Sequence, residues 1–142
     1  MTNPMTPMGV RVGNMWRSAG AVLAGFLAVA VFSMVTDEVL HLLHVYPPWG
    51  QPMYNGLSFL ALSYRIVFTI AGGYITAKFA PGNPMRHALA LGVLGTVVGI
   101  SSAIFTIPMH LGPSWYPISL AVTGLPCCWL GGVLYRARHP EG

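Results

Sequence analysis

Four long apolar stretches take up most of this chain of 142 residues and restrict what it can fold into. A bilayer core about 30 Å thick needs roughly 20 residues of α-helix, because each residue advances a helix by about 1.5 Å. The four stretches reach that length, at about 17–44, 57–80, 86–107 and 116–136. We therefore predict an all-α, four-transmembrane-helix antiparallel bundle that forms a single integral membrane domain over residues 1–142.

The scarcity of charge agrees with a membrane location. Only 7% of the residues are charged, against about 25% in soluble domains, and the mean hydropathy is +0.63. The seven Lys and Arg are scattered without a basic patch, which argues against nucleic-acid binding. The partners that we expect are membrane lipids and either further copies of the chain or a larger membrane complex.

The positions of the basic residues predict how the spans are oriented, since Lys and Arg near span ends are retained in the cytoplasm. The first and third connections contain neither residue, so we expect both termini to be cytoplasmic. A removable signal peptide is the alternative, but the first apolar run continues past its only cleavage-like segment, Ala28-Val-Ala30. The basic residues that flank the spans are Arg11, Arg17, Lys78, Arg86, Arg136 and Arg138.

Small residues recur at steps of three and four along the last three stretches, which indicates the faces where helices pack closely. Gly95 and Gly99 form a G-x-x-x-G pair, and Pro126 is expected to kink the fourth helix or to free a carbonyl. The predicted inward faces are Ala61, Arg65, Thr69, Gly72 and Thr76; Ala88, Gly92, Gly95, Gly99, Ser102 and Thr106; and Leu120, Gly124, Cys127 and Gly131.

The motif H-x-x-P-x-W occurs twice, from His44 to Trp49 and from His110 to Trp115. Both copies follow a span that runs outward. This spacing predicts two helical hairpins related by a parallel repeat, with coincidence among residues that loops favour as the alternative.

Asp37, Glu38 and Arg65 lie well inside the predicted spans, where a charge is costly and usually paired or functional. Asp37 and Arg65 lie at nearly the same depth, about 10 Å below the outer ends of their helices, so we predict an intramembrane charge pair between them. Glu38 points about 100° away from Asp37. Ser102 and Thr123 lie at a similar depth and complete a predicted polar layer.

The histidines raise the question of a metal or ligand site. Glu38 and His41 have the E-x-x-H spacing of di-iron bundles, but three carboxylates, one of them Glu141, are too few for that centre. A smaller site from His41, His44 and His110 with either Asp37 or Glu38 would suit zinc or copper, and haem is a further alternative. We predict no cofactor, because an interfacial polar role accounts for each histidine.

Several segments carry a resemblance: Thr36-Asp-Glu-Val-Leu-His41, Tyr64-Arg65, Gly72-Gly-Tyr74 with Ala77, Ala80-Pro81, Pro84-Met-Arg-His-Ala-Leu89 and Gly112-Pro-Ser-Trp-Tyr-Pro117. On these the chain resembles small bacterial four-helix integral membrane proteins that have no assigned activity. The resemblance implies four spans in a bacterial inner membrane and implies no mechanism.

The leading functional hypothesis is a non-catalytic accessory or scaffold subunit with a structural Asp37–Arg65 pair. One alternative is an outward-facing site that receives a proton, an ion or a quinone-like head group. A second alternative is an oligomeric transporter or channel, since four helices alone enclose little space.

Overall fold

A computed structural model describes residues 8–140 of the chain, with side chains from residue 13 onward; the side chain of Arg11 and the residue Glu141 lie outside the described part. The four long helices of this part are α1 (Met8–Leu42), α2 (Asn55–Phe79), α3 (Pro84–Thr106) and α4 (Trp115–Arg138), and the short 3-10 helix η1 (Ile107–Met109) follows α3. Each long helix contains a stretch of sufficient length and hydropathy to cross a membrane. The predicted four-helix bundle is confirmed.

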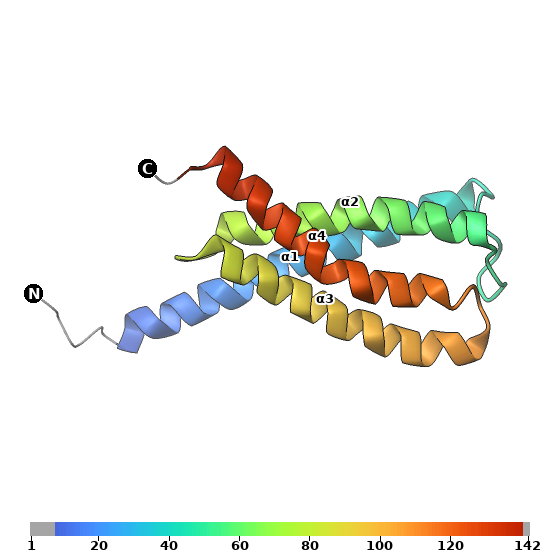
Figure 1. The fold of residues 1–142 in the computed structure, drawn as a ribbon, viewed down its shortest axis with the longest axis horizontal. Helices are drawn as coiled ribbons and strands as arrows, with labels where there is room; N and C mark the ends of the chain where they lie inside the picture. Colours follow the sequence, from blue (N-terminus) through green and yellow to red (C-terminus); the bar gives the residue numbers. More distant parts are fainter. Residues whose placement is uncertain (1–7, 141–142) are drawn as a thin grey trace, which may run out of the picture.

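Successive helices run in opposite directions, so α1 begins and α4 ends at the same end of the bundle (Figure 1). We call this the terminal end; it also holds residues 80–83. The loop end is opposite and holds residues 43–54 and 107–114. Helices α2 and α3 each pack against the three other long helices, whereas α1 and α4 make little contact with each other. Helices α2 and α3 therefore form the centre of the bundle.

Helices α2 and α4 approach each other backbone to backbone, through glycine. A Cβ atom added to Gly73 would lie 2.6 Å from the carbonyl oxygen of Cys128, and one added to Gly131 would lie 2.6 Å from the backbone nitrogen of Tyr74. Real side chains do not fit in such a space. Of these two glycines, Gly131 belongs to the predicted inward face of its helix, whereas Gly73 does not and instead follows the predicted Gly72.

Helix α3 uses its small residues differently from the prediction. Gly99 packs on Ala121, whose Cα atom would lie 2.8 Å from an added Cβ, and Gly92 packs on Leu125. An added Cβ on Gly95 would meet nothing within 4 Å. Of the G-x-x-x-G pair, only Gly99 therefore faces α4 at close range. The second glycine in close contact with α4 is Gly92, two helical turns away, and not Gly95.

Helix α1 ends at Leu42, two residues before the predicted limit, in a Schellman motif. The backbone N–H of Val45 donates to the carbonyl of Leu40 at 2.9 Å, and that of His44 donates to the carbonyl of His41 at 3.0 Å. His44 has a φ of +58°, the left-handed conformation that terminates helices in this way.

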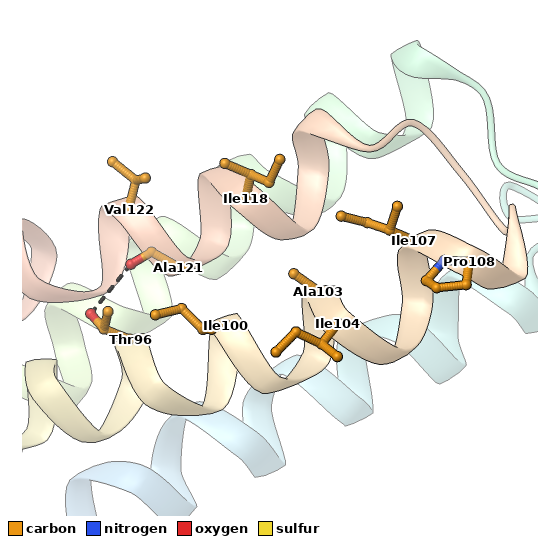
Figure 2. Close-up of a pocket in the computed structure, with 9 residues that line it drawn as sticks. All are labelled: Thr96, Ile100, Ala103, Ile104, Ile107, Pro108, Ile118, Ala121 and Val122. Atoms are coloured by element: carbon orange, nitrogen blue, oxygen red, sulfur yellow. Dashed lines mark hydrogen bonds between the residues drawn. The ribbon is translucent and has the colours of Figure 1, made fainter.

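The outer surface of the bundle is apolar, as expected for a protein in contact with lipid. Between α3 and α4 it contains an open groove of about 520 Å³, whose floor includes a hydrogen bond from Thr96 Oγ1 to the carbonyl of Ala121 (Figure 2). Helix α4 continues through Pro126, and Figure 1 shows it changing direction along its length. Proline explains such a bend, since it supplies no N–H to the preceding turn.

Candidate functional site

An ion pair joins α1 to α2 near the loop end. The guanidinium nitrogen Nη2 of Arg65 lies 2.5 Å from Oδ2 of Asp37. The side chain of Asp37 is 17% exposed and that of Arg65 is 30% exposed, so both charges are largely withdrawn from the surface. The predicted pairing of these two residues is confirmed.

Two tyrosines extend this pair into a network. Tyr64 donates a hydrogen bond to Oδ1 of Asp37, so both carboxylate oxygens are engaged. The hydroxyls of Tyr64 and Tyr46 lie 3.0 Å apart and are also hydrogen-bonded. Tyr46 is buried and belongs to the loop after α1. The network therefore connects α1, α2 and the first loop.

The electrostatics of the loop residue Tyr46 follow from its burial. Burial raises the pKa of the Tyr46 hydroxyl above its ordinary value, and the negative charge of Asp37 acts in the same direction. The hydrogen bond with Tyr64 and the charge of Arg65 oppose this increase in pKa without cancelling it. The hydroxyl is therefore neutral at physiological pH, and it donates to Tyr64, whose own O–H is given to Asp37.

His41 lies beside the pair and is held from two sides. Its Nδ1 donates to the backbone carbonyl of Asp37 at 2.7 Å. Its ring stacks on Trp49, with centroids 4.0 Å apart and planes inclined by 11°. The ring of Tyr46 packs against the same imidazole in a T-shaped arrangement, with centroids 5.4 Å apart. His41 thus fixes the proline-rich loop over the end of α1.

The two loops of the loop end are also joined to each other. The backbone N–H of Met53 donates to the carbonyl of Leu111 at 2.8 Å. The indole Nε1 of Trp115 donates to Oδ1 of Asn55 at 3.0 Å. These contacts close the loop end over a buried apolar cluster of Tyr46, Leu57 and Ala61.

A pocket of about 210 Å³ lies among these elements. Its walls combine the charged pair with aromatic and apolar side chains, and Tyr116 brings α4 to it. Arg65 Nε is buried and has no hydrogen-bond partner among the described residues. The guanidinium therefore has donor capacity that the chain itself does not use.

The remaining predicted site residues lie apart from this network. Glu38 and Ser102 are exposed, and Thr123 donates to the carbonyl of Ser119 in its own helix at 2.7 Å. Within residues 8–140, no group of three or more His, Cys, Asp or Glu lies close enough to hold a metal ion. The set Glu38, His41, His44 and His110 is thus not gathered in this structure.

The two histidines of the repeated H-x-x-P-x-W motif have backbone roles instead. His44 and His110 have φ values of +58° and +53°, and they are the described non-glycine residues with positive φ. Both are exposed and each ends a helix at the loop end. Histidine is enriched in this conformation relative to most side chains. The two copies of the motif therefore share one structural feature, a histidine in the left-handed conformation at the end of a helix.

Tyr46 and Tyr64 were not identified from the sequence as residues of the site. Tyr64 precedes Arg65 in the chain, and a hydroxyl beside an intramembrane charge is a signal that could have been followed. Tyr46 carried no such signal, because only the path of the loop brings it to Tyr64.

Comparison of this chain with protein-family models, with curated proteins and with solved structures finds no match in any of the three. The site therefore has to be interpreted from its own geometry.

Proposed function

We propose that this chain is a small non-catalytic membrane protein, an accessory or scaffold subunit, in which Asp37 and Arg65 hold α1 and α2 in register. The observation that carries the proposal is the engagement of both oxygens of Asp37, by Arg65 and by Tyr64. Each oxygen of this carboxylate already accepts a hydrogen bond from a side chain of α2. That arrangement suits a structural pair better than a transport site.

The energetics of a charge in a membrane support this role. Removing one partner of a buried pair leaves the other charge uncompensated and typically costs about 3 to 5 kcal/mol. The pair joins residues 28 positions apart, so each charge is neutralised only when α1 and α2 are correctly aligned. The pair therefore penalises every other register of the hairpin.

We further propose that the terminal end is cytoplasmic and that the membrane is a bacterial inner membrane. Apart from Arg65, the Lys and Arg side chains of the described part lie at or next to the terminal end. The two loops of the loop end contain neither residue. Retention of basic residues on the cytoplasmic side supports this orientation.

A double-mutant cycle tests the structural pair. The free energy of unfolding would be measured by denaturant titration in mixed micelles for Asp37→Leu, Arg65→Leu and the double variant. We expect Arg65→Leu to lower it more than the double variant does, because the double variant strands no charge. Glu38→Leu is the matched control, since Glu38 is an exposed acid next to Asp37. Equal losses in the single and double variants would contradict the proposal.

The scaffold role has a separate test. Native mass spectrometry in mild detergent would report the assembly state, and a self-associating scaffold predicts multiples of 15.2 kDa. An accessory subunit predicts a defined complex with a second membrane protein. A monomer without any partner would argue against both forms of the proposal.

A further inference from the structure

The pocket at the loop end has the size of a site for one small ring. Its volume is about 210 Å³, and a cavity of about 150 Å³ is sufficient to hold benzene. One six-membered ring with small substituents therefore fits, whereas a haem does not. The size alone restricts the class of ligand.

The walls of the pocket are suited to a flat molecule. His41 and Trp49 form a stacked pair on one side, and Tyr46 and Tyr116 add further aromatic surface. Met53 and Leu111 contribute apolar surface where the two loops meet. Aromatic walls of this kind contact a planar ring over a large area.

The polar part of the pocket donates hydrogen bonds. A guanidinium carries five N–H groups. In Arg65 the Nη2 atom donates to Asp37, while Nε has no partner among the described residues. Nε is itself buried, but the side chain of Arg65 is 30% exposed, so a ligand would meet the other N–H groups of the guanidinium. Asp37 has no unengaged oxygen, so the pocket favours a ligand that accepts hydrogen bonds.

The charge balance decides between a neutral and an anionic acceptor. Asp37 and Arg65 neutralise each other, so a bound carboxylate would bring an uncompensated negative charge into a site of low dielectric. A neutral carbonyl oxygen accepts from Arg65 without that cost. The groove between α3 and α4 offers no comparable chemistry, because its single polar side chain, Thr96, already binds Ala121 (Figure 2).

We infer that the loop-end pocket binds a small neutral ring that carries carbonyl oxygens, which is the chemistry of a quinone head group. The aromatic walls take the ring, and Arg65 donates to a carbonyl oxygen. This inference goes beyond the proposed function, because the ion pair keeps the helices in register whether or not the pocket is filled.

The test uses the full chain in lipid nanodiscs, titrated with duroquinone by calorimetry after subtraction of empty nanodiscs. Duroquinone is a single ring with two carbonyls, and its four methyl groups prevent addition of cysteine thiols. We expect saturable binding of one molecule per chain. Benzoate, which presents a carboxylate on a ring of similar size, should bind at least about tenfold more weakly. Absence of saturable duroquinone binding, or tighter binding of benzoate, would overturn the inference.

Two variants locate the site. Trp49→Ala removes a wall and should weaken duroquinone binding at least about tenfold. Trp16→Ala is its matched control, because Trp16 is similarly exposed (74% against 69%) but lies at the terminal end, and it should bind as the parent does. Equal binding by both variants would place the ligand elsewhere and contradict the inference.

Arg65→Lys tests the donor. Lysine keeps the positive charge beside Asp37 but lacks the fork of N–H groups, so we expect about tenfold weaker binding with a helical content like that of the parent by circular dichroism. Unchanged affinity in a folded Arg65→Lys variant would show that the guanidinium does not hold the carbonyl. If this variant does not fold, the comparison of Trp49→Ala with Trp16→Ala decides.

Discussion

Tyr64 donates a hydrogen bond to Oδ1 of Asp37 from the position next to Arg65, which binds Oδ2 of the same carboxylate. Consecutive residues of a helix point about 100° apart. Asp37 can accept from both only when it lies between their directions. The two bonds therefore define the rotation of α1 against α2 as well as its register.

The two tyrosines of the network should differ in their effect on stability. Tyr64→Phe removes a hydrogen bond to a charged group and should lower the free energy of unfolding by about 1.5 to 3 kcal/mol. Tyr46→Phe removes a bond between neutral hydroxyls and should cost about 0.5 to 1.5 kcal/mol. Denaturant titration of both variants in mixed micelles gives the comparison. A larger loss in Tyr46→Phe would mean that the carboxylate is not the stronger partner.

The stability of the protein should fall at alkaline pH partly through Tyr46. Because burial raises the pKa of its hydroxyl in the folded state above 10.0, the unfolded chain loses this proton first as pH rises. The contribution of Tyr46 is therefore complete below pH 10.0 and is lost above it. Unfolding free energies measured from about pH 8 to about pH 11 should decline less steeply in Tyr46→Phe. An identical decline in both proteins would assign the effect to other groups.

Replacement of His44 should separate its backbone role from a role as a ligand. Glycine accepts a positive φ without strain, so His44→Gly should leave stability unchanged or raise it by up to about 1 kcal/mol. Valine is strained there, so His44→Val should lower stability by about 1 to 2 kcal/mol. Thermal unfolding of the purified variants measures both. Retention of a metal by the parent chain and its loss in a His41→Ala, His44→Ala double variant would show instead that the histidines are ligands.

The effect of replacing a helical glycine by alanine should depend on how close the neighbouring helix lies to the added methyl group. Gly73→Ala places a methyl group against the backbone of Cys128 and should destabilise the bundle by about 1 to 3 kcal/mol. Gly95→Ala meets open space and is the matched control. It should be neutral in an unfolding titration. A loss in Gly95→Ala as large as that in Gly73→Ala would indicate that Gly95 contacts a second copy of the chain.

The proposed orientation can be tested by labelling introduced cysteines in intact cells. Ser114→Cys lies in an exposed loop of the loop end, and His139→Cys lies exposed at the terminal end. The native cysteines, Cys127 and Cys128, are buried. A membrane-impermeant maleimide should label Ser114→Cys in intact cells and His139→Cys only after lysis. The opposite pattern would reverse the orientation.

Much of this molecule could be predicted because the relevant information is local. The spans follow from runs of apolar residues, and their ends follow from proline and glycine. The Asp37–Arg65 pair was also accessible, since few partners exist for a charge at that depth. The spans and the ion pair can both be predicted from approximate depths along the helices, without accurate positions for residues that are distant in the chain.

The tertiary structure decided the choices that depend on side-chain positions. It selected Gly99 and Gly92 for contact and left Gly95 open, and it made His44 a helix terminator. It also brought Tyr46 to Tyr64 and formed a pocket beside Arg65. The sequence determined by itself that four helices cross a membrane, because length and hydropathy add up along the chain. Hydrogen-bond partners and enclosed space depend on distances across the bundle, which only the folded chain defines.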